Sequence, residues 1–340
     1  MVSALLKDLS GYDVQGPFNT IYIGGGSPSV LPRENLFFLI KQIVARWGVK
    51  TEFTVEANPS QVDGYVLQNL FDLGVNRISI GAQSFDQTLL KFLGRKHNSS
   101  DVVNAVKLAR QVGFENVSLD LIFAIPGSDI NSWRSDLQSA IDLGVEHISA
   151  YSLTYEEDTP LKADLDAGAV TSVDEQRDRE MYELAIDMLS QTGIDQYEIS
   201  NFARNGFQCK HNLSYWANEP YIGIGPAAGG YWQGRRTLNV ADVKDYVERI
   251  DTGQMVFDQQ ETVSGVDLAC ETAVLNLRRI AGINLVEFKE ATGYDAMTLF
   301  GEAIEKNCQS GLLQAAQGRV FLTREALPIA DSVLCDFASI

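Results

Sequence analysis

Cysteine and histidine are scarce in this chain of 340 residues, which holds four cysteines and three histidines. The cysteines, Cys209, Cys270, Cys308 and Cys335, lie far apart and form no CxxC or CxxxCxxC pattern. Such spacing is typical of reduced thiols in a cytosol-like compartment, and it offers no cysteine-based cluster site. We therefore expect a cytoplasmic protein whose own cysteines hold no iron–sulfur cluster.

Long apolar runs and an excess of basic charge are missing as well. No stretch approaches the roughly 18–20 apolar residues that a membrane-spanning helix requires. The apolar start of the chain is too short, and followed by too many charges, to be a signal peptide. Acidic side chains outnumber basic ones by 45 to 27, which gives a net charge of −18. Because such a surface repels phosphate groups and anionic lipid, we expect neither nucleic acid nor a membrane as a partner.

The chain does contain a repeated phrase in which a helix end, a glycine and a short strand follow one another. Copies begin at Leu73, Val112 and Leu143, and a weaker fourth copy begins at Thr192. Helix-length segments separate these copies, so the pattern predicts parallel strands joined by helical crossovers. No Gly-x-Gly-x-x-Gly motif marks the first turn. The predicted fold is therefore α/β, a partial TIM-type (β/α) barrel rather than a doubly wound sheet.

Polar residues stand where the predicted strands end. The segment 20–29 (TIYIGGGSPS) runs from a short strand into three glycines, which let the backbone turn tightly and approach a ligand. In barrels of this kind the chemistry lies at the carboxyl ends of the strands. The other polar groups expected at this rim are Glu56, Gln83, Ser84, Asp120, Tyr151, Ser152, Glu198, Ser200 and Asn201. Their convergence predicts a ligand site.

Helical patterns dominate the last part of the chain, over residues 267–281, 285–291 and 295–310, before a predicted hairpin at 311–323. We expect two domains: a barrel over residues 1–235 and a small, mainly helical, winged-helix-like domain over 236–340. The second carries no concentrated Lys/Arg face, which argues against a role in reading DNA.

Ordered motifs between residues 20 and about 232 resemble the radical S-adenosylmethionine (SAM) superfamily. GGGSP is similar to the superfamily's GGGTP segment. VEANP (55–59), SIGAQSF (79–85), LGRKH (93–97) and LDLIFAIPG (119–127) follow in the same order. Within the superfamily the chain resembles the oxygen-independent coproporphyrinogen III oxidases and the HemW-type heme chaperones. YEISNFA (197–203) and HNLSYW (211–216) favour the chaperone branch.

The resemblance implies a SAM site on the predicted rim. Its expected members are Gly25, Gly26, Ser27, Glu56, Gln83, Arg95 and Asp120. The glycines and Ser27 would contact the methionyl part of SAM through main-chain groups, and the fork of Arg95 would hold its carboxylate. The other three would contact the amino group or the ribose hydroxyls. Taken alone, Arg95 is equally consistent with a surface arginine and Asp120 with a helix N-cap.

The HNLSYW stretch is a candidate heme site. An imidazole nitrogen of His211 can ligate iron, and Tyr215 and Trp216 can pack against a porphyrin face. Cys209 is an alternative soft ligand. A structural histidine that hydrogen-bonds beside two buried aromatic rings would explain the same residues without heme. If heme does bind, the implied partner is a heme-acceptor protein, which the sequence does not identify.

This chain departs from the superfamily in lacking the CxxxCxxC loop that holds a [4Fe–4S] cluster. Only 19 residues precede Thr20, and none is cysteine. The first barrel strand and the cluster loop are therefore expected to be absent, through truncation or as a natural loss in a pseudo-enzyme. Strand 20–23 would then form an edge of the sheet. A smaller departure is Ala124, where the family generally has glycine.

Three functions follow from these expectations. The first is a heme chaperone that binds heme, passes it to an acceptor protein and carries a SAM-binding barrel. The second is oxygen-independent coproporphyrinogen III oxidation, and the third is a cluster-less pseudo-enzyme of the same family. Because the cluster cysteines are absent, we do not expect catalysis by this chain alone.

Overall fold

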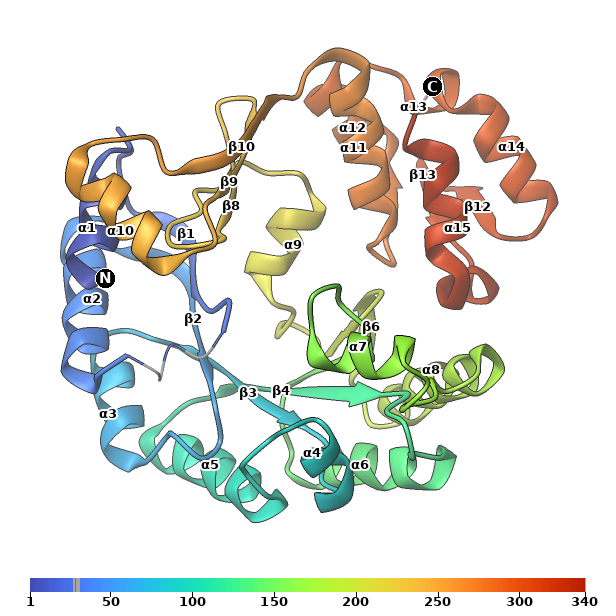
Figure 1. Ribbon diagram of the computed structural model, residues 1–340. Coiled ribbons are helices and arrows are strands. Elements are labelled where there is room, and N and C mark those ends of the chain that lie inside the picture. The colour runs from blue at the N-terminus through green and yellow to red at the C-terminus, as the bar shows by residue number, and fades with distance from the viewer. Residues whose placement is uncertain (27, 29–30, 340) are drawn as a thin grey trace. The chain divides into compact units, whose positions relative to one another are not determined.

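The computed structural model describes residues 1–26, 28 and 31–339 (Figure 1). They form two compact units, each built from separate stretches of chain. The first unit comprises Met1–Thr20, Glu34–Thr51 and Cys209–Ile340, and the second comprises Ile21–Arg33 and Glu52–Gln208. The expected domain boundary at residue 235 stays a prediction.

A curled seven-stranded sheet forms the core of the second unit, with strand order β1-β2-β3-β4-β5-β7-β6. Neighbouring strands from β2 to β5 are parallel, so the predicted partial (β/α) barrel is confirmed. β1 is outermost among the described strands, as expected for an edge. The strands are β1 (Phe18–Ile23), β2 (Val49–Ala57), β3 (Arg77–Gln83), β4 (Asn116–Phe123), β5 (His147–Ser152), β6 (Asp195–Glu198) and β7 (Asn201–Ala203).

The end of this sheet differs from the expected run of parallel strands. β7 lies between β5 and β6 and is antiparallel to both. β6, where the fourth copy of the repeat predicts a further parallel strand, is instead antiparallel to β7 and ends the sheet among the described residues. Only Ile199 and Ser200 separate β6 from β7, and a connection this short forces the chain to reverse into a hairpin. All three residues of β7 are buried, which explains why they pair inside the sheet.

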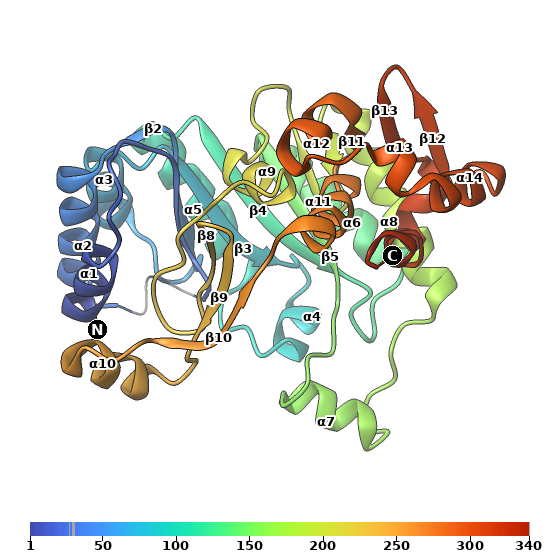
Figure 2. The ribbon, with the colours of Figure 1, turned by 90° about the horizontal axis from the view of Figure 1, so that it is seen from above.

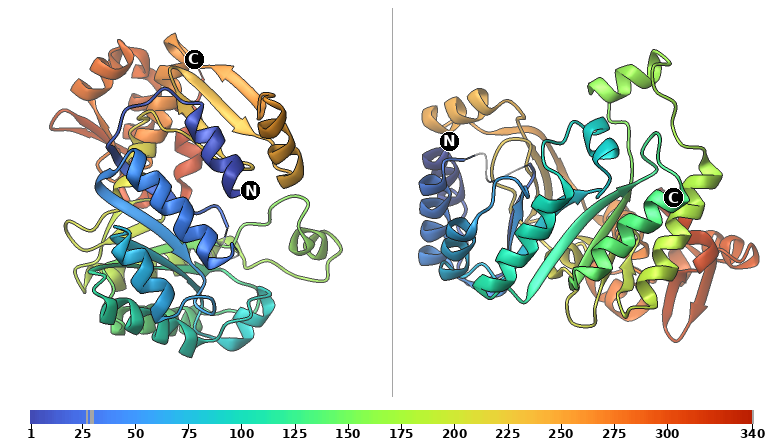
Figure 3. Two further views of the ribbon diagram at one scale, coloured as in Figure 1. Left: turned by 90° about the vertical axis from the view of Figure 1, so that its left-hand side faces the viewer. Right: turned by 90° about the horizontal axis from the view of Figure 1, so that it is seen from below.

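Helices cover the apolar face of the sheet (Figure 3, right). α5 (Ser99–Val112) contacts β3, α6 (Ile130–Asp142) contacts β4, and α8 (Glu175–Ser190) contacts β4 and β5. Asp174 caps α8 by accepting from the Arg177 N–H at 3.0 Å. The remaining helices of this unit are α3 (Gly64–Asp72), α4 (Gln87–Phe92) and α7 (Pro160–Asp166). α7 has no buried residue and stands away from the sheet in Figure 2.

In the first unit, α1 (Val2–Ser10) packs against α10 (Val243–Thr252). Ala4 of α1 is buried with Val240, Tyr246, Ile250 and Val256. The segments before and after α10 form an antiparallel sheet in the order β10-β9-β8, which the sequence analysis did not predict. Its strands are β8 (Gly229–Trp232), β9 (Arg235–Asn239) and β10 (Phe257–Thr262), and the unit also holds most of α2 (Arg33–Arg46).

The C-terminal region is mainly helical, as expected, with the predicted hairpin before its last helical segments. The hairpin strands β12 (Leu313–Ala316) and β13 (Arg319–Leu322) pair with the short β11 (Ile283–Asn284). The expected helix 295–310 is two helices that break at Phe300. The α-helices of the C-terminal region are α11 (Gly265–Leu277), α12 (Leu285–Thr292), α13 (Ala296–Leu299), α14 (Gly301–Gln309) and α15 (Ala330–Leu334). No helix among the described residues is long and apolar enough to cross a membrane.

Ala124, directly after β4, has a φ of 55° and is buried. A Cβ in this left-handed region destabilises the folded state by about 1–2 kcal/mol. Glycine, in turn, gives the unfolded chain more conformational entropy, which lowers the free energy of unfolding by about 0.4–1 kcal/mol. We expect Ala124→Gly to raise the free energy of unfolding by roughly 0.5–1 kcal/mol, measured by urea denaturation. The control, Ala303→Gly inside α14, should lose about 1 kcal/mol. Equal destabilisation of the two variants would contradict the strain at Ala124.

Candidate functional site

Alternation of side chains along the central strands gives the sheet one apolar and one polar face. Ile78 and Ile80 of β3, and Val117 and Leu119 of β4, are fully buried. The residues between them point to the opposite face, because successive side chains of a strand alternate. That face carries Glu56, Arg77, Ser79, Ser118, Asp120, His147 and Ser149. A polar face on a sheet already covered by helices on its other side is suited to a polar ligand.

Asp120 lies at the middle of the polar face. The Ser79 hydroxyl donates to its carboxylate at 3.1 Å, and the Ser149 hydroxyl donates to it as well. Asp120 is paired directly with Ser149 on β5, whereas on β3 it is paired with Gly81, and Ser79 lies two residues before Gly81 on the same face. Burial raises the pKa of Asp120 above its ordinary value, and the two hydroxyls and Arg77 only partly offset that effect. The carboxylate can therefore accept hydrogen bonds or hold a proton.

Glu56, near the end of β2, binds the glycine loop that follows β1. Its carboxylate accepts from the Tyr22 hydroxyl at 2.9 Å and from the backbone N–H groups of Gly25 and Gly26. Burial is the main cause of a raised pKa, and the negative charge of Asp120 adds to it. Glu56 thus connects β1, the loop and the Asp120 cluster.

The three glycines of the loop serve two different steric needs. A Cβ on Gly24 would lie 2.6 Å from the Glu56 carboxyl carbon and 2.5 Å from the Tyr22 ring, so only glycine fits there. Gly25 and Gly26 have φ values of 77° and 138°, where glycine is favoured. Among the described atoms, a Cβ on either would meet none within 4 Å. The backbone of Gly25 and Gly26 is therefore open toward the described part of the chain, which suits main-chain contacts to a ligand.

Hydrogen bonds thus join three of the residues expected to bind SAM, Gly25, Gly26 and Glu56, and the charge of a fourth, Asp120, acts on Glu56. Gln83 ends β3 with a φ of 66°, beside an irregularity in the pairing with β4. Arg95 is exposed after α4, and in the described residues no hydrogen bond or ion pair joins its side chain to that cluster. Ser27 lies outside the described residues.

The remaining polar strand ends do not all face this site. Ser84 is buried and donates to Asp136 of α6 at 2.6 Å, so it belongs to the helix-covered side of the sheet. Ser152 donates to Asp178 of α8. By contrast, Tyr151 hydrogen-bonds to Ser149 and Asn201, and Asn201 donates to Glu198. Fewer of the polar strand ends therefore face the candidate site than the sequence predicted.

Sequence reasoning missed several groups of the site. Tyr22, Ser79 and Ser149 contact the two carboxylates, and period-two alternation along the strands was the signal that could have found them. His97 is also buried, and its Nε2 donates to the Ala82 carbonyl at 3.0 Å. This bond fixes the segment that contains Arg95 to the end of β3.

The candidate heme segment forms α9 (Lys210–Trp216) in the first unit, and none of its residues is fully buried. Both ring nitrogens of His211 are engaged. Nδ1 lies 2.8 Å from Thr20 Oγ1 of β1, and Nε2 lies 2.8 Å from the Tyr215 hydroxyl. The Tyr215 ring stacks edge-on against Tyr221, with centroids 4.5 Å apart. The histidine of HNLSYW is therefore both partly exposed and hydrogen-bonded.

Two neighbours of His211, Cys209 and Trp216, are less accessible to a heme than the histidine is. Cys209 is fully buried at the start of α9, so ligation by its sulfur would require the helix to open. Trp216 lies under the Arg278 guanidinium, 4.9 Å from the ring centroid. One face of the indole is thus already covered by a cation.

The cysteines of this chain do not fit a [4Fe–4S] cluster. Cys209 and Cys270 are buried, Cys308 is half-buried and Cys335 is exposed. Over residues 1–26, 28 and 31–339, no three cysteine, histidine or acidic side chains gather as a metal site would require. SAM is different, because bare backbone at Gly25 and Gly26, beside two carboxylates, fits a ligand that carries an ammonium group and hydroxyls.

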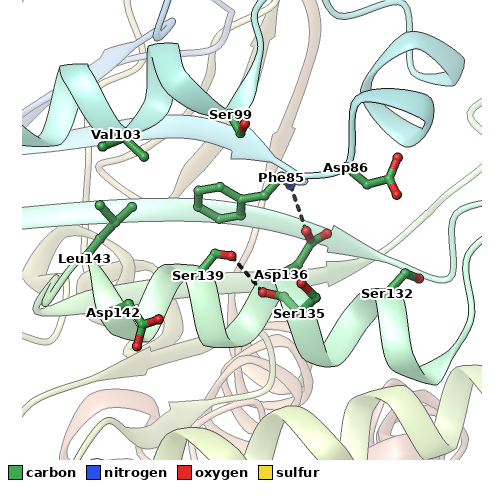
Figure 4. A pocket seen from close by; sticks show the side chains of 10 residues that line it. All are labelled: Phe85, Asp86, Ser99, Val103, Ser132, Ser135, Asp136, Ser139, Asp142 and Leu143. Carbon is green, nitrogen blue, oxygen red and sulfur yellow. Dashed lines mark hydrogen bonds between the residues drawn. The ribbon is translucent and has the colours of Figure 1, made fainter.

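A pocket of about 530 Å³ opens on the helix-covered side of the sheet (Figure 4). It lies between the start of α5, the loop after β3, and α6. The lining residues are Phe85, Asp86, Ser99, Val103, Ser132, Ser135, Asp136, Ser139, Asp142 and Leu143. None belongs to the glycine loop or to the polar face, so this pocket is separate from the candidate SAM site.

Comparison with known proteins agrees with this geometry. The model of the radical SAM superfamily matches residues 4–140, and that of the HemN C-terminal domain matches residues 263–329. The solved structure described as "Coproporphyrinogen III oxidase (HemN) from Escherichia coli is a Radical SAM enzyme" aligns with a TM-score of 0.84. The alignment covers 99% of this chain and 82% of that one at 16% identity, so it shows the fold alone.

Curated relatives are similar over nearly the whole chain. "Heme chaperone HemW" of Bacillus subtilis (strain 168) is 36% identical over 95% of this chain and 86% of the relative. The protein of the same name from Lactococcus lactis subsp. lactis (strain IL1403) is 34% identical over 99% and 88%. Together with the glycine loop and the HNLSYW helix, these similarities show that the chain belongs to the HemW family of the radical SAM superfamily.

Proposed function

We propose that this protein binds heme at α9 and passes it to an acceptor protein, and that it binds SAM at the glycine loop. The observation that carries the proposal is the partly exposed His211 in a chain whose relatives, at 34–36% identity, bear the name heme chaperone. A chaperone must release its cargo, and a helix without buried residues leaves a ligand accessible to a second protein.

For SAM, the backbone of Gly25 and Gly26 would hold the methionyl part, and Glu56 and Asp120 would accept from its ammonium group or ribose hydroxyls. Gln83 and Arg95 would complete the site, with the Arg95 fork on the carboxylate. In this superfamily, SAM bound beside a reduced iron–sulfur cluster would supply radical chemistry. The cysteines of this chain do not fit a cluster, and the residues named above would hold SAM as a ligand.

For heme, the proposed ligand is His211, with Tyr215 and Trp216 packing against the porphyrin. The acceptor is a protein that takes a ligated heme from a partly exposed helix. We propose a cytoplasmic location, which the wide spacing of the four cysteines in the sequence supports.

Heme titration followed at the Soret band tests this function. We expect saturable binding by the wild type and an affinity at least roughly 100-fold lower for His211→Ala, because a metal–ligand bond is lost. Cys209→Ser is the matched control and should bind as the wild type does. Absence of saturable binding by the wild type would refute heme binding, and loss of binding in Cys209→Ser alone would move the ligand to the sulfur.

A further inference from the structure

The two hydrogen bonds of His211 come from opposite sides of its ring. Thr20 holds Nδ1 from β1, and Tyr215 holds Nε2 from one turn further along α9, each at 2.8 Å. All three residues lie in the first unit. Because an iron atom needs a free imidazole lone pair, one of these bonds must break before His211 can ligate heme.

The two contacts are compatible with either tautomer of a neutral His211 ring, because the Thr20 and Tyr215 hydroxyls can each donate or accept. With the proton on Nδ1, the ring donates to Thr20 Oγ1, and Nε2 accepts from the Tyr215 O–H. In this tautomer the lone pair of Nε2 faces the Tyr215 hydroxyl.

We propose that Tyr215 is a latch that occupies His211 Nε2 in the heme-free protein, and that Thr20 is a positioning residue that fixes the Nδ1–H tautomer. Heme iron then takes Nε2 only as the Tyr215 hydroxyl releases it. This inference rests on the proposed function, in which heme binds at α9. It adds a means of regulating that site: the tyrosine competes with iron for one nitrogen, while the threonine supports the ligand from behind.

The two roles have opposite energetic signs. A net neutral hydrogen bond contributes about 1 kcal/mol, so the latch lowers heme affinity by about fivefold. A partner on the far nitrogen of a ligating histidine orients the ring, and its loss typically costs about 10–100-fold in metal affinity. The edge-on contact between Tyr215 and Tyr221 keeps the phenol ring in place. Phenylalanine at position 215 would preserve that packing while removing the hydroxyl.

Heme titration and stopped-flow association on four variants test the latch. Tyr215→Phe should bind heme about fivefold more tightly than the wild type. Thr20→Val should bind at least about tenfold more weakly, and Thr20→Ser, which keeps the hydroxyl, should restore wild-type affinity. His211→Ala is the fourth variant. A tightened Tyr215→Phe together with rescue by serine supports the proposal, whereas weaker binding by Tyr215→Phe or unchanged binding by Thr20→Val overturns it.

His211→Ala separates failure of this inference from failure of the proposed function. If His211→Ala binds heme like the wild type, ligation by His211 is refuted, and the latch with it. Suppose that His211→Ala fails to bind heme, but that Tyr215→Phe does not bind it more tightly than the wild type and Thr20→Val does not bind it more weakly. Ligation by His211 then stands, and only the latch is refuted. Imidazole ¹⁵N NMR of the heme-free protein gives a readout without heme, and three histidines make it tractable. It should find the proton of His211 on Nδ1; a proton on Nε2 would contradict the proposed tautomer.

Discussion

Gly24→Ala is expected to lower the affinity for SAM roughly 100-fold. The added methyl would lie 2.6 Å from the Glu56 carboxyl and 2.5 Å from the Tyr22 ring, so the Glu56 side chain must move. Moving it breaks the bonds from Tyr22, Gly25 and Gly26 that shape the loop. Hydrogen bonds to charged groups contribute about 1.5–3 kcal/mol each, and a loss of about 3 kcal/mol corresponds to two orders of magnitude in Kd.

Isothermal titration with SAM, together with urea unfolding, measures this effect. Overpacking should also lower the free energy of unfolding of Gly24→Ala by about 1–3 kcal/mol. The control is Gly64→Ala at the start of α3, where a Cβ would meet its nearest neighbour at an ordinary 3.9 Å. That variant should bind SAM normally. A Gly24→Ala protein with wild-type affinity would mean that Glu56 does not shape the SAM site.

The second large effect concerns the buried Asp136 of α6, shown in Figure 4. Burial raises its pKa from 3.8 to about 6, while bonds from the Ser84 hydroxyl and the Phe85 N–H lower it, and the nearby charge of Asp86 raises it. Between these two pKa values the folded protein binds more protons than the unfolded chain. The stabilising contribution of Asp136 is therefore present at low pH and is lost as the pH rises through about 6.

Asp136→Asn should remove this pH dependence. The free energy of unfolding of the wild type, relative to the variant, should fall by roughly 2 kcal/mol between about pH 4.5 and about pH 7.5. Urea titrations of both proteins at several pH values give the difference directly. Asp142→Asn, an exposed change in the same pocket, should track the wild type at every pH. Parallel curves for the wild type and Asp136→Asn would show that Asp136 titrates normally.

Much of the barrel could be predicted because its local signals agree with its tertiary structure. Each repeated helix–glycine–strand phrase ends a helix and starts a buried strand, so the parallel strands β3, β4 and β5 follow from spacing alone. The β6–β7 hairpin could not be predicted in this way. Three buried residues give too short a pattern to distinguish a strand from a loop. The β8–β9–β10 sheet escaped for a related reason, since most side chains of β10 are exposed and show no alternation.

The candidate site was predictable in its members more than in their contacts. Motif order identified the glycine loop, Glu56 and Asp120, but not that Glu56 binds the loop amides. Ser84 illustrates the limit, because its position after a strand suggested a rim residue. Ser84 comes one residue after Gln83, the last residue of β3, and its hydroxyl donates to Asp136 on the helix-covered side of the sheet instead. Similarly, the sequence identified His211, while its partner Thr20 lies 191 positions away in the chain.

The interleaved composition of the first unit has a consequence for biosynthesis. α1 is synthesised long before its packing partner α10, which lies more than 230 residues later, and Lys7 donates to the Ile250 carbonyl across 243 positions. During translation the apolar side of α1 therefore stays exposed to solvent until the residues up to about 256 have left the ribosome. Nascent chains halted before that point should be captured by cellular holdases, and those halted well beyond it should escape them.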